Sequence, residues 1–357
     1  MKPSKKIDLR SDTVTKPSPS MWDALKSMDN SHLGDDVEKD DPNVNKLEKI
    51  AAKLVGKPAA LFVTSGTQGN LTSILSQTQP GEEILTEQHS HVVKWEVGGV
   101  ARIGGLMVRT YPSNKGTFNP FDLNSLVRDR SDIHQPTTSL ITLENTHNYH
   151  GGIAISPQLF KETREFADTH NLKIHLDGAR IFNACVALQK PVTDYTKYVD
   201  SIQFCLSKGL SCPIGSIIAG TEDFIQHARK WRKMLGGGWR QAGIIAVFGI
   251  NALEEKWIQR LGEDHANAKL LAKGLNEAEG EVPIHVPTPD TNIVMVEFTK
   301  SIEMEKLYEI VTDLHKHGVL CYDMGPRIRL VTHYGITEED INYCVPVITK
   351  ILQDHLS

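Results

Sequence analysis

Apolar residues occur in short runs along the first two thirds of the chain, and helical patterns separate these runs. Runs without a regular polar alternation are typical of strands that are covered on both faces, as in a parallel sheet. Strands that alternate with helices in this way predict the α/β class. We expect seven such strands, at Ala59–Val63, Glu83–Thr86, Leu106–Thr110, Ser139–Leu143, Leu172–Leu176, Ser201–Phe204 and Ser216–Ala219.

One helix between these strands is marked by its own signals. Ser156 can accept a backbone hydrogen bond at the start of a helix, and Pro157 suits the first turn, where its missing N–H would be unpaired. The residues that follow predict one face packed against the sheet, because apolar and small side chains recur with helical spacing at Leu159, Phe160, Thr163, Phe166 and Ala167.

The pattern changes after about residue 240. A long helical pattern from Gln241 to Gln259 is followed by a mixed order of helices and strands, which indicates a smaller α+β domain. There we expect helices at Gly262–Ala278, Glu303–His317 and Thr337–Gln353, and strands near Ile284 and at Ile293–Phe298, Val319–Tyr322 and Ile328–Val331. We therefore predict an N-terminal arm (1–16), a large domain (17–245) and a small C-terminal domain (246–357).

Composition and charge narrow the class of protein. The 357 residues include 39 basic and 44 acidic side chains, which argues against a nucleic-acid partner despite the locally basic segment 229–233. No apolar run approaches the roughly 20 residues that span a bilayer, and the basic start lacks the apolar core of an export signal. Five cysteines without a CxxC pair are typical of free thiols. We expect a cytosolic protein without a membrane partner.

Two segments at the ends of predicted strands could bind anions. Ser65, Gly66 and Thr67 lie between a strand and a helical pattern, where free N–H groups, hydroxyls and the helix dipole favour a phosphate. Asp177 ends another strand, where α/β sheets place their ligands, and Arg180 follows three residues later. Taken alone, each segment is better explained without a ligand, the first as a helix N-cap turn and the second as a helix-capping aspartate with a solvated arginine.

A lysine completes the set. Lys208 follows the strand Ser201–Phe204, and Gly209 beside it allows a ligand to approach closely. A free lysine amine has a pKa near 10.4 and must be desolvated or placed near positive charge to act as a nucleophile. Alone, Lys208 is best explained as a surface lysine. Together, an anion site, a carboxylate and a lysine are the parts that pyridoxal phosphate (PLP) requires for its phosphate, its ring nitrogen and a Schiff base.

Short polar and glycine-rich stretches run nearly from one end of the chain to the other, at residues 8–15, 34–37, 40–42, 65–68, 143–148, 177–180, 207–209, 231–234, 236–241 and 329–333. In these stretches the chain resembles the low-specificity L-threonine aldolases, within the aromatic amino acid β-eliminating lyase group. The resemblance implies the fold-type-I (aspartate aminotransferase-type) fold, with a mainly parallel seven-stranded sheet and a smaller C-terminal domain. It also implies PLP as cofactor and a homotetramer built from dimers with shared sites.

The resemblance implies a role for each matching residue. Lys208 would bind PLP covalently, Asp177 would pair with the pyridine nitrogen, and His91 would stack on the ring. Ser65, Gly66 and Thr67 would bind the phosphate, and His147 matches a second active-site histidine. Ser11, Arg180 and Arg329 would bind the substrate carboxylate or the cofactor. Lys233 and Arg240 would reach the phosphate of a neighbouring subunit.

The implied reaction is retro-aldol cleavage of L-threonine or L-allo-threonine to glycine and acetaldehyde, the work of a carbon–carbon lyase. An arginine would hold the α-carboxylate through two parallel hydrogen bonds, and a histidine would take the proton of the β-hydroxyl. Whether His91 or His147 is this base stays open, and His91 is favoured for stacking. The alternatives are another PLP-dependent β-eliminating lyase or an amino acid racemase on the same fold, and a non-catalytic protein that kept the scaffold.

Two local features bear on the substrate and on metals. Glu38-Lys39 stands where family members often have Tyr-Gly, which changes the polarity of a loop that would border the aldehyde pocket. His89 and His91 have the spacing of two ligands on one face of a strand, but no further ligand cluster is evident, so we expect no catalytic metal. A structural cation near Thr13 and Thr15 is suggested by relatives and is left open by the sequence.

Overall fold

The computed structural model describes residues 5–277 and 282–356. Within these ranges, seven strands form one sheet in the order β2-β8-β7-β6-β5-β3-β4. β8 runs antiparallel to both of its neighbours, and the other pairs are parallel. The seven predicted strands are confirmed to within one residue at each end: β2 Ala59–Val63, β3 Glu83–Glu87, β4 Met107–Tyr111, β5 Thr138–Glu144, β6 Lys173–Asp177, β7 Ser201–Cys205 and β8 Ser216–Gly220.

Except in the largely exposed edge strand β4, side chains of this sheet are buried on both faces, which accounts for the apolar runs. In β2, Ala60 and Phe62 belong to the main core, whereas Leu61 and Val63 pack in a second cluster on the other face. Successive strand side chains point to opposite faces, so a strand between two helical layers has no solvent-facing positions to fill with polar residues.

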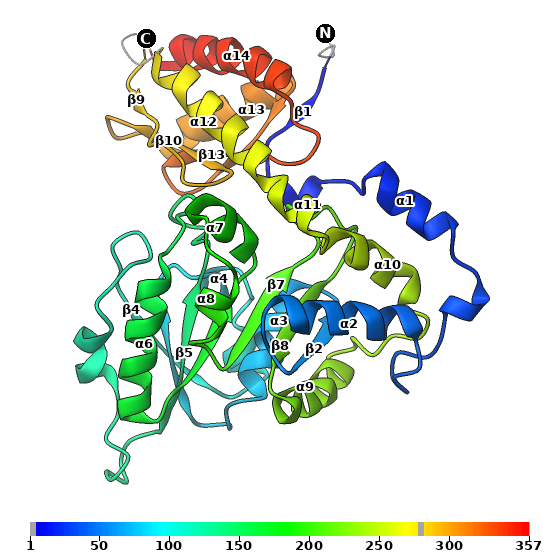
Figure 1. The fold of residues 1–357 in the computed structure, drawn as a ribbon. Coiled ribbons are helices and arrows are strands. Elements are labelled where there is room, and N and C mark those ends of the chain that lie inside the picture. The colour runs from blue at the N-terminus through cyan, green and yellow to red at the C-terminus, as the bar shows by residue number, and fades with distance from the viewer. Residues whose placement is uncertain (1–4, 278–281, 357) are drawn as a thin grey trace.

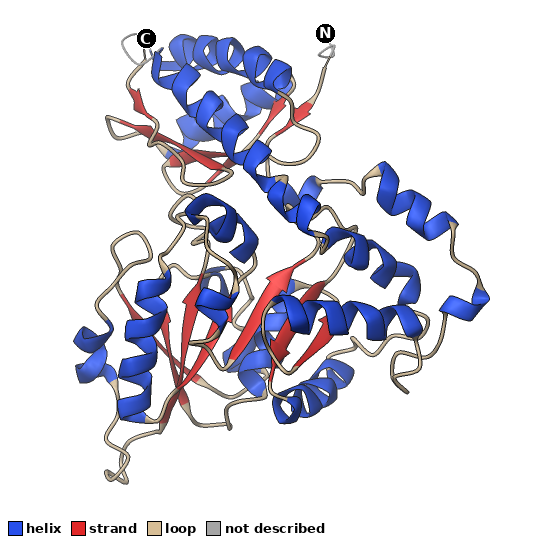
Figure 2. Ribbon diagram, in the orientation of Figure 1, coloured by secondary structure: helices blue, strands red, loops and turns tan. Residues whose placement is uncertain are grey.

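Helices flank the sheet on both faces (Figures 1 and 2). The helix predicted from Ser156 is confirmed as α6 (Pro157–His170): Ser156 Oγ accepts the N–H of Gln158 at 3.3 Å, and the five predicted core positions are buried. The other helices of this part are α1 Pro19–Lys26, α2 Pro42–Leu54, α3 Gly66–Leu75, α4 His91–Lys94, α5 Gly99–Arg102, α7 Ile181–Leu188, α8 Thr193–Thr196, α9 Glu222–Met234, α10 Gly243–Ala252 and α11 Glu255–Gln259.

The single helix predicted from Gln241 to Gln259 is wrong. The structure has two helices there, α10 and α11, and the chain breaks between them at Leu253 and Glu254. The break lets α11 turn toward the loop after β7, where Trp257 Nε1 donates to the carbonyl oxygen of Leu210 at 2.9 Å. Because α10 is apolar around most of its circumference, the hydrophobic periodicity of its sequence does not indicate where the helix ends.

The C-terminal part contains a second sheet, whose four described strands run antiparallel in the order β12-β13-β10-β9, with helices packed against it (Figure 1). The strand predicted at Val319–Tyr322 is divided, because β11 leaves this sheet and pairs in parallel with β1 (Ile7–Asp8) of the N-terminal arm. The elements are β9 Ile284–His285, β10 Ile293–Phe298, β11 Val319–Leu320, β12 Tyr322–Asp323, β13 Arg327–Val331, α12 Leu261–Glu277, α13 Met304–Lys316 and α14 Glu338–Leu356.

α12 connects the two hydrophobic cores. Leu261 at its start packs in the core of the large sheet, together with side chains of α10 and α11, whereas Ala268 and Leu271 pack in the core of the small sheet. The packing therefore places the transition between the cores within α12, and the domain boundary predicted after residue 245 stays a prediction. No helix in the described ranges is long and apolar enough to cross a membrane.

Candidate active site

A cavity of about 380 Å³ opens at the C-terminal edge of the large sheet, next to the small sheet. Its lining draws on the N-terminal arm, on loops that follow strands of the large sheet, and on β12 and β13. Five of the predicted site residues line it, namely Ser11, His91, Arg180, Lys208 and Arg329. The fold thus brings together residues that are more than 300 positions apart in the chain.

Asp177 is a buried anion beside this cavity. It ends β6, and its two carboxylate oxygens accept hydrogen bonds from Asn70 Nδ2 and Gln203 Nε2, each at 2.8 Å. Burial alone would raise the pKa of Asp177, but the charges of His91 and Lys208 and the bond from Asn70 hold it below its ordinary value. Asp177 is therefore ionised at neutral pH and interacts electrostatically with the Lys208 amine.

The start of α3 offers an anion site at the same edge of the sheet. Ser65 caps the helix, and its Oγ accepts the N–H of Gln68 at 3.1 Å. The N–H groups of Gly66 and Thr67 make no hydrogen bond to another described residue. A Cβ added to Gly66 would lie 2.9 Å from the Sγ of Cys205, so the helix starts directly against the end of β7. Free N–H groups at a helix N-terminus favour a phosphate.

The two arginines of the cavity differ in their partners. Arg180 donates from Nε and Nη2 to the two carboxylate oxygens of Asp12, each at 2.7 Å. Arg329 donates to Asn148 Oδ1 at 3.0 Å and to the carbonyl oxygen of Arg10 at 3.1 Å, and no described carboxylate pairs with it. Burial, together with the charge of Arg180, lowers the pKa of Arg329 to about 9. A buried guanidinium in this state is suited to bind an incoming carboxylate.

His91 lies at the start of α4 and faces the cavity. Its Nδ1 lies 2.7 Å from Glu96 Oε1, and its backbone N–H donates to Glu144 Oε2 at 2.6 Å. Burial lowers the pKa of His91, but the hydrogen bond to Glu96 and the charge of Asp177 outweigh it, so the net shift is upward. Burial also raises the pKa of Glu96. This pair therefore holds a proton at Nδ1 and leaves Nε2 for exchange with a ligand.

Asp177 and the residues at the start of α3 do not line the cavity itself, and neither do three further predicted site residues. His147 is buried, and its Nε2 lies 3.1 Å from Glu87 Oε2. Burial lowers the pKa of His147, but the carboxylates of Glu144, Glu87 and Asp177 raise it above its ordinary value. Lys233 and Arg240 are exposed, and Arg240 forms a 2.8 Å ion pair with Asp35.

The loop that carries Glu38-Lys39 packs on α9. Asp36 and Arg232 form a buried ion pair with a 2.7 Å contact, which holds the loop against the helix. Glu38 and Lys39 are exposed and lie outside the cavity of this chain. Lys39 adopts a φ of 63°, in the left-handed region that favours glycine. The backbone therefore keeps the conformation that suits the glycine common at this position, although the side chain differs.

Comparison with known proteins identifies the family of this chain. Residues 8–301 match the family described as beta-eliminating lyase. The chain belongs to this family. It is 41% identical over 335 residues to the low specificity L-threonine aldolase of Escherichia coli (strain K12), covering 94% of this chain and 96% of that protein. It is 40% identical to low-specificity L-threonine aldolase 1 of Arabidopsis thaliana, covering 94% of each. A threonine aldolase structure from Leishmania major, 20% identical, has the same fold, with a TM-score of 0.80 over 97% of this chain and 99% of that one.

Asn70, Glu96 and Gln203 are among the polar residues of this site that the sequence did not single out. Asn70 donates to both Glu96 Oε1 at 2.7 Å and Asp177 Oδ2 at 2.8 Å, and so connects the two carboxylates. Gln203 carried a signal, because a polar residue at the centre of a strand covered on both faces needs a buried partner. Asn70 and Glu96 carried none, since polar residues are common at helix surfaces and in loops.

Proposed function

We propose that this protein is a PLP-dependent L-threonine aldolase, which cleaves L-threonine or L-allo-threonine to glycine and acetaldehyde. The observation that supports it best is that the Lys208 amine, the buried Asp177 anion and Arg329 lie around one cavity. Arg329 has no carboxylate partner among the described residues. Relatives that are about 40% identical over most of the chain are low-specificity L-threonine aldolases, which supports the same reaction.

The residues at this edge of the sheet fit PLP. The free N–H groups of Gly66 and Thr67, with the hydroxyl of Ser65, would hold the phosphate. Asp177 would face the ring nitrogen, and as an anion it would keep a proton there. Lys208 would supply the amine. When bound, PLP provides an electron sink for the electron pair released at the substrate Cα.

The chain's own groups direct the cleavage. Arg329 holds the substrate carboxylate and so sets the orientation of the Cα–Cβ bond. His91 Nε2 takes the proton from the β-hydroxyl, because Nδ1 is occupied by Glu96 and because His147 lies outside the cavity. As that O–H bond breaks, the Cα–Cβ bond breaks and acetaldehyde leaves. A proton then returns to Cα, which gives glycine.

The deciding experiment is a product analysis of the purified protein incubated with PLP and L-threonine. Formation of acetaldehyde and glycine in equal amounts supports the proposal. A 2-oxo acid with ammonia would indicate a β-eliminating lyase, and D-threonine or D-allo-threonine would indicate a racemase. Absence of both turnover and the yellow colour of bound PLP would indicate a non-catalytic protein.

Replacing Arg329 with leucine should lower kcat/KM for threonine by about 100-fold or more, since two hydrogen bonds to a charged group are worth about 1.5–3 kcal/mol each. The visible absorbance of bound PLP should persist, because Arg329 is assigned to the substrate. Steady-state kinetics and absorbance spectra measure both effects. Arg102→Leu, at an exposed position, is the matched control. Unchanged kcat/KM in Arg329→Leu would contradict the assignment.

Glu96→Gln should shift the pH dependence of kcat/KM. The hydrogen bond to Glu96 raises the pKa of His91, and only the unprotonated His91 can accept a proton. Loss of the carboxylate lowers the pKa of His91, so the acidic limb of the profile should move to lower pH. Profiles of wild type and variant measured between about pH 5 and 9 test this. An acidic limb that stays in place would assign the base to another group.

We further propose a homotetramer with shared sites, located in the cytosol. Lys233 and Arg240 match residues that reach a neighbouring subunit's phosphate, and both are exposed and outside the cavity of their own chain. The five cysteines are free and buried, which supports a reducing compartment. Gel filtration of active enzyme at about four times 39.7 kDa supports the tetramer, and full activity at 39.7 kDa would contradict it.

A further inference from the structure

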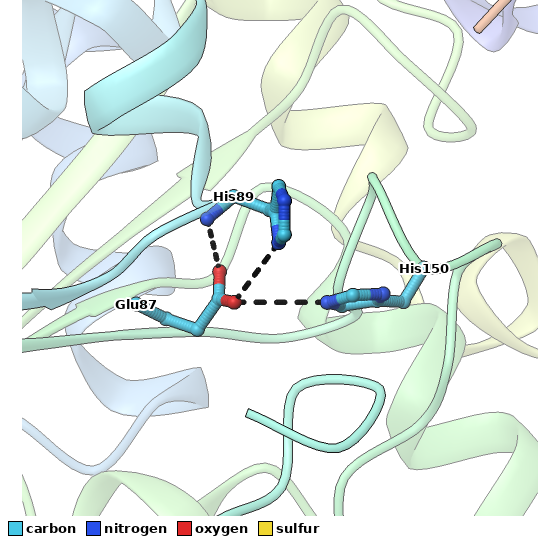
Figure 3. Close-up of side chains that lie close together, drawn as sticks. All are labelled: Glu87, His89 and His150. Carbon is cyan, nitrogen blue, oxygen red and sulfur yellow. Dashed lines mark hydrogen bonds and ion pairs between the residues drawn. The ribbon is translucent and has the colours of Figure 1, made fainter. Parts of the chain in front are cut away.

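Outside the PLP site, three side chains converge on one point (Figure 3). Glu87 Oε1 lies 3.4 Å from His89 Nδ1 and 3.7 Å from His150 Nε2. These three atoms all lie within 4.8 Å of one another. Figure 3 shows both imidazole rings directed at the carboxylate. His91, Glu96 and Asp177 form a similar group, but they belong to the PLP site described above.

The two facing nitrogens have no hydrogen-bond partner. His89 Nδ1 and His150 Nε2 are both buried and make no hydrogen bond to any described residue. Both nitrogens lie at ion-pair distance from Glu87 Oε1 but make no hydrogen bond to it. A buried polar nitrogen without a hydrogen bond costs free energy. A group bound between the three atoms would satisfy both nitrogens at once.

The carboxylate is held in place by its other contacts. Glu87 Oε2 accepts the backbone N–H of His89 at 2.6 Å and faces His147 Nε2 at 3.1 Å. Ser113 Oγ donates to Oε1 at 3.0 Å. The His89 ring is stacked on Tyr149, with ring centroids 4.3 Å apart and planes 4° from parallel. Oε1 and His89 Nδ1 are therefore positioned before any ligand binds.

We propose that Glu87, His89 and His150 bind one divalent transition-metal ion, for which Zn²⁺ is the best match. Two imidazoles and a carboxylate are a ligand set that Zn²⁺ takes, with a fourth position left for water. Bonds of about 2.0–2.1 Å in tetrahedral geometry place neighbouring ligand atoms roughly 3.3–3.4 Å apart. The spacings of 3.4 and 3.7 Å around Glu87 are close to that value.

The ion would connect two loops of the active-site edge. His89 lies in the loop between β3 and α4, two residues before His91, and His150 follows β5, three residues after His147. Gly151 and Gly152, with φ of 87° and 71°, let the chain turn directly after His150. Bound Zn²⁺ would therefore cross-link the segments that carry both candidate histidines, without touching the PLP site.

The test is calorimetric titration of the chelator-treated, dialysed holoenzyme with ZnCl₂. We expect one saturable site per chain, and His89→Gln and His150→Gln should each weaken it by about 100-fold or more, since even residues behind a ligand matter by 10- to 100-fold. His134→Gln, at an exposed position, is the matched control and should bind as wild type does.

Absence of a saturable site in the wild type would overturn the proposal, as would unchanged affinity in either ligand variant. Circular dichroism and the absorbance of bound PLP check that each variant is folded. If one histidine variant does not fold, the other decides, with Glu87→Gln as a third variant that keeps the side-chain shape. The readout is metal binding itself, so it does not depend on the proposed threonine cleavage.

Discussion

Lys208→Ala should abolish the yellow colour of bound PLP and lower the rate of threonine cleavage by about three orders of magnitude or more. Lys208 supplies the one lysine amine among the described residues that line the cavity, so no second amine can replace it. Losses of this size are typical when the nucleophile is removed from a group of residues that act as a unit. Absorbance spectra of the variant with added PLP and assays of acetaldehyde measure both effects.

A surface lysine provides the control for this result. Lys161→Ala, in the exposed part of α6, should keep both the colour and the activity. Unchanged absorbance and turnover in Lys208→Ala would remove the basis of the proposed function. Loss of activity with the colour retained would assign Lys208 to a later proton transfer and the covalent bond to another amine.

Asp177→Asn should lower kcat by a factor between about one hundred and a few thousand. Removing one partner of a buried ion pair costs about 3–5 kcal/mol, and the cation left without a partner here would be the protonated ring nitrogen. The amide has nearly the same shape, so PLP should still bind through Lys208 and the start of α3. Steady-state kinetics with saturating PLP, together with the absorbance spectrum, separate loss of rate from loss of cofactor.

The exposed Asp223→Asn in α9 is the matched control and should behave as wild type does. A variant Asp177→Asn with full kcat would show that the carboxylate does not act on the ring nitrogen. In that case the interaction of Asp177 with the charges of His91 and Lys208, which lowers its pKa, would have a structural role only.

The large sheet could be predicted closely because all of its strands except the largely exposed edge strand β4 are covered on two faces. Such strands need unbroken apolar runs, and the turns between them break those runs sharply. The split between α10 and α11 was missed because an apolar helix has no polar face on which to mark its end. β1 was missed because Ile7 and Asp8 make a two-residue strand, and its partner β11 lies over 300 residues away.

The site could be predicted where a residue type is dictated by chemistry. Lys208, Asp177 and the start of α3 each supply a group that one cofactor needs. The partners of these groups were harder to predict, because Asn70 and Glu96 owe their roles to contacts between distant segments. The group formed by Glu87, His89 and His150 was missed for the same reason: His150 approaches from a loop about 60 residues away.

The N-terminal arm determines when the cavity can assemble during folding. Ser11 lines the cavity and Asp12 neutralises Arg180, whereas Ile7 and Leu9 are anchored in the core of the C-terminal sheet. Arg329, contributed by that sheet, completes the lining. A ribosome must therefore finish nearly the whole polypeptide before the cavity can close, and neither half of a proteolytically cut chain would contain it. Trimming a dozen residues from the start would leave a buried guanidinium without its counter-charge.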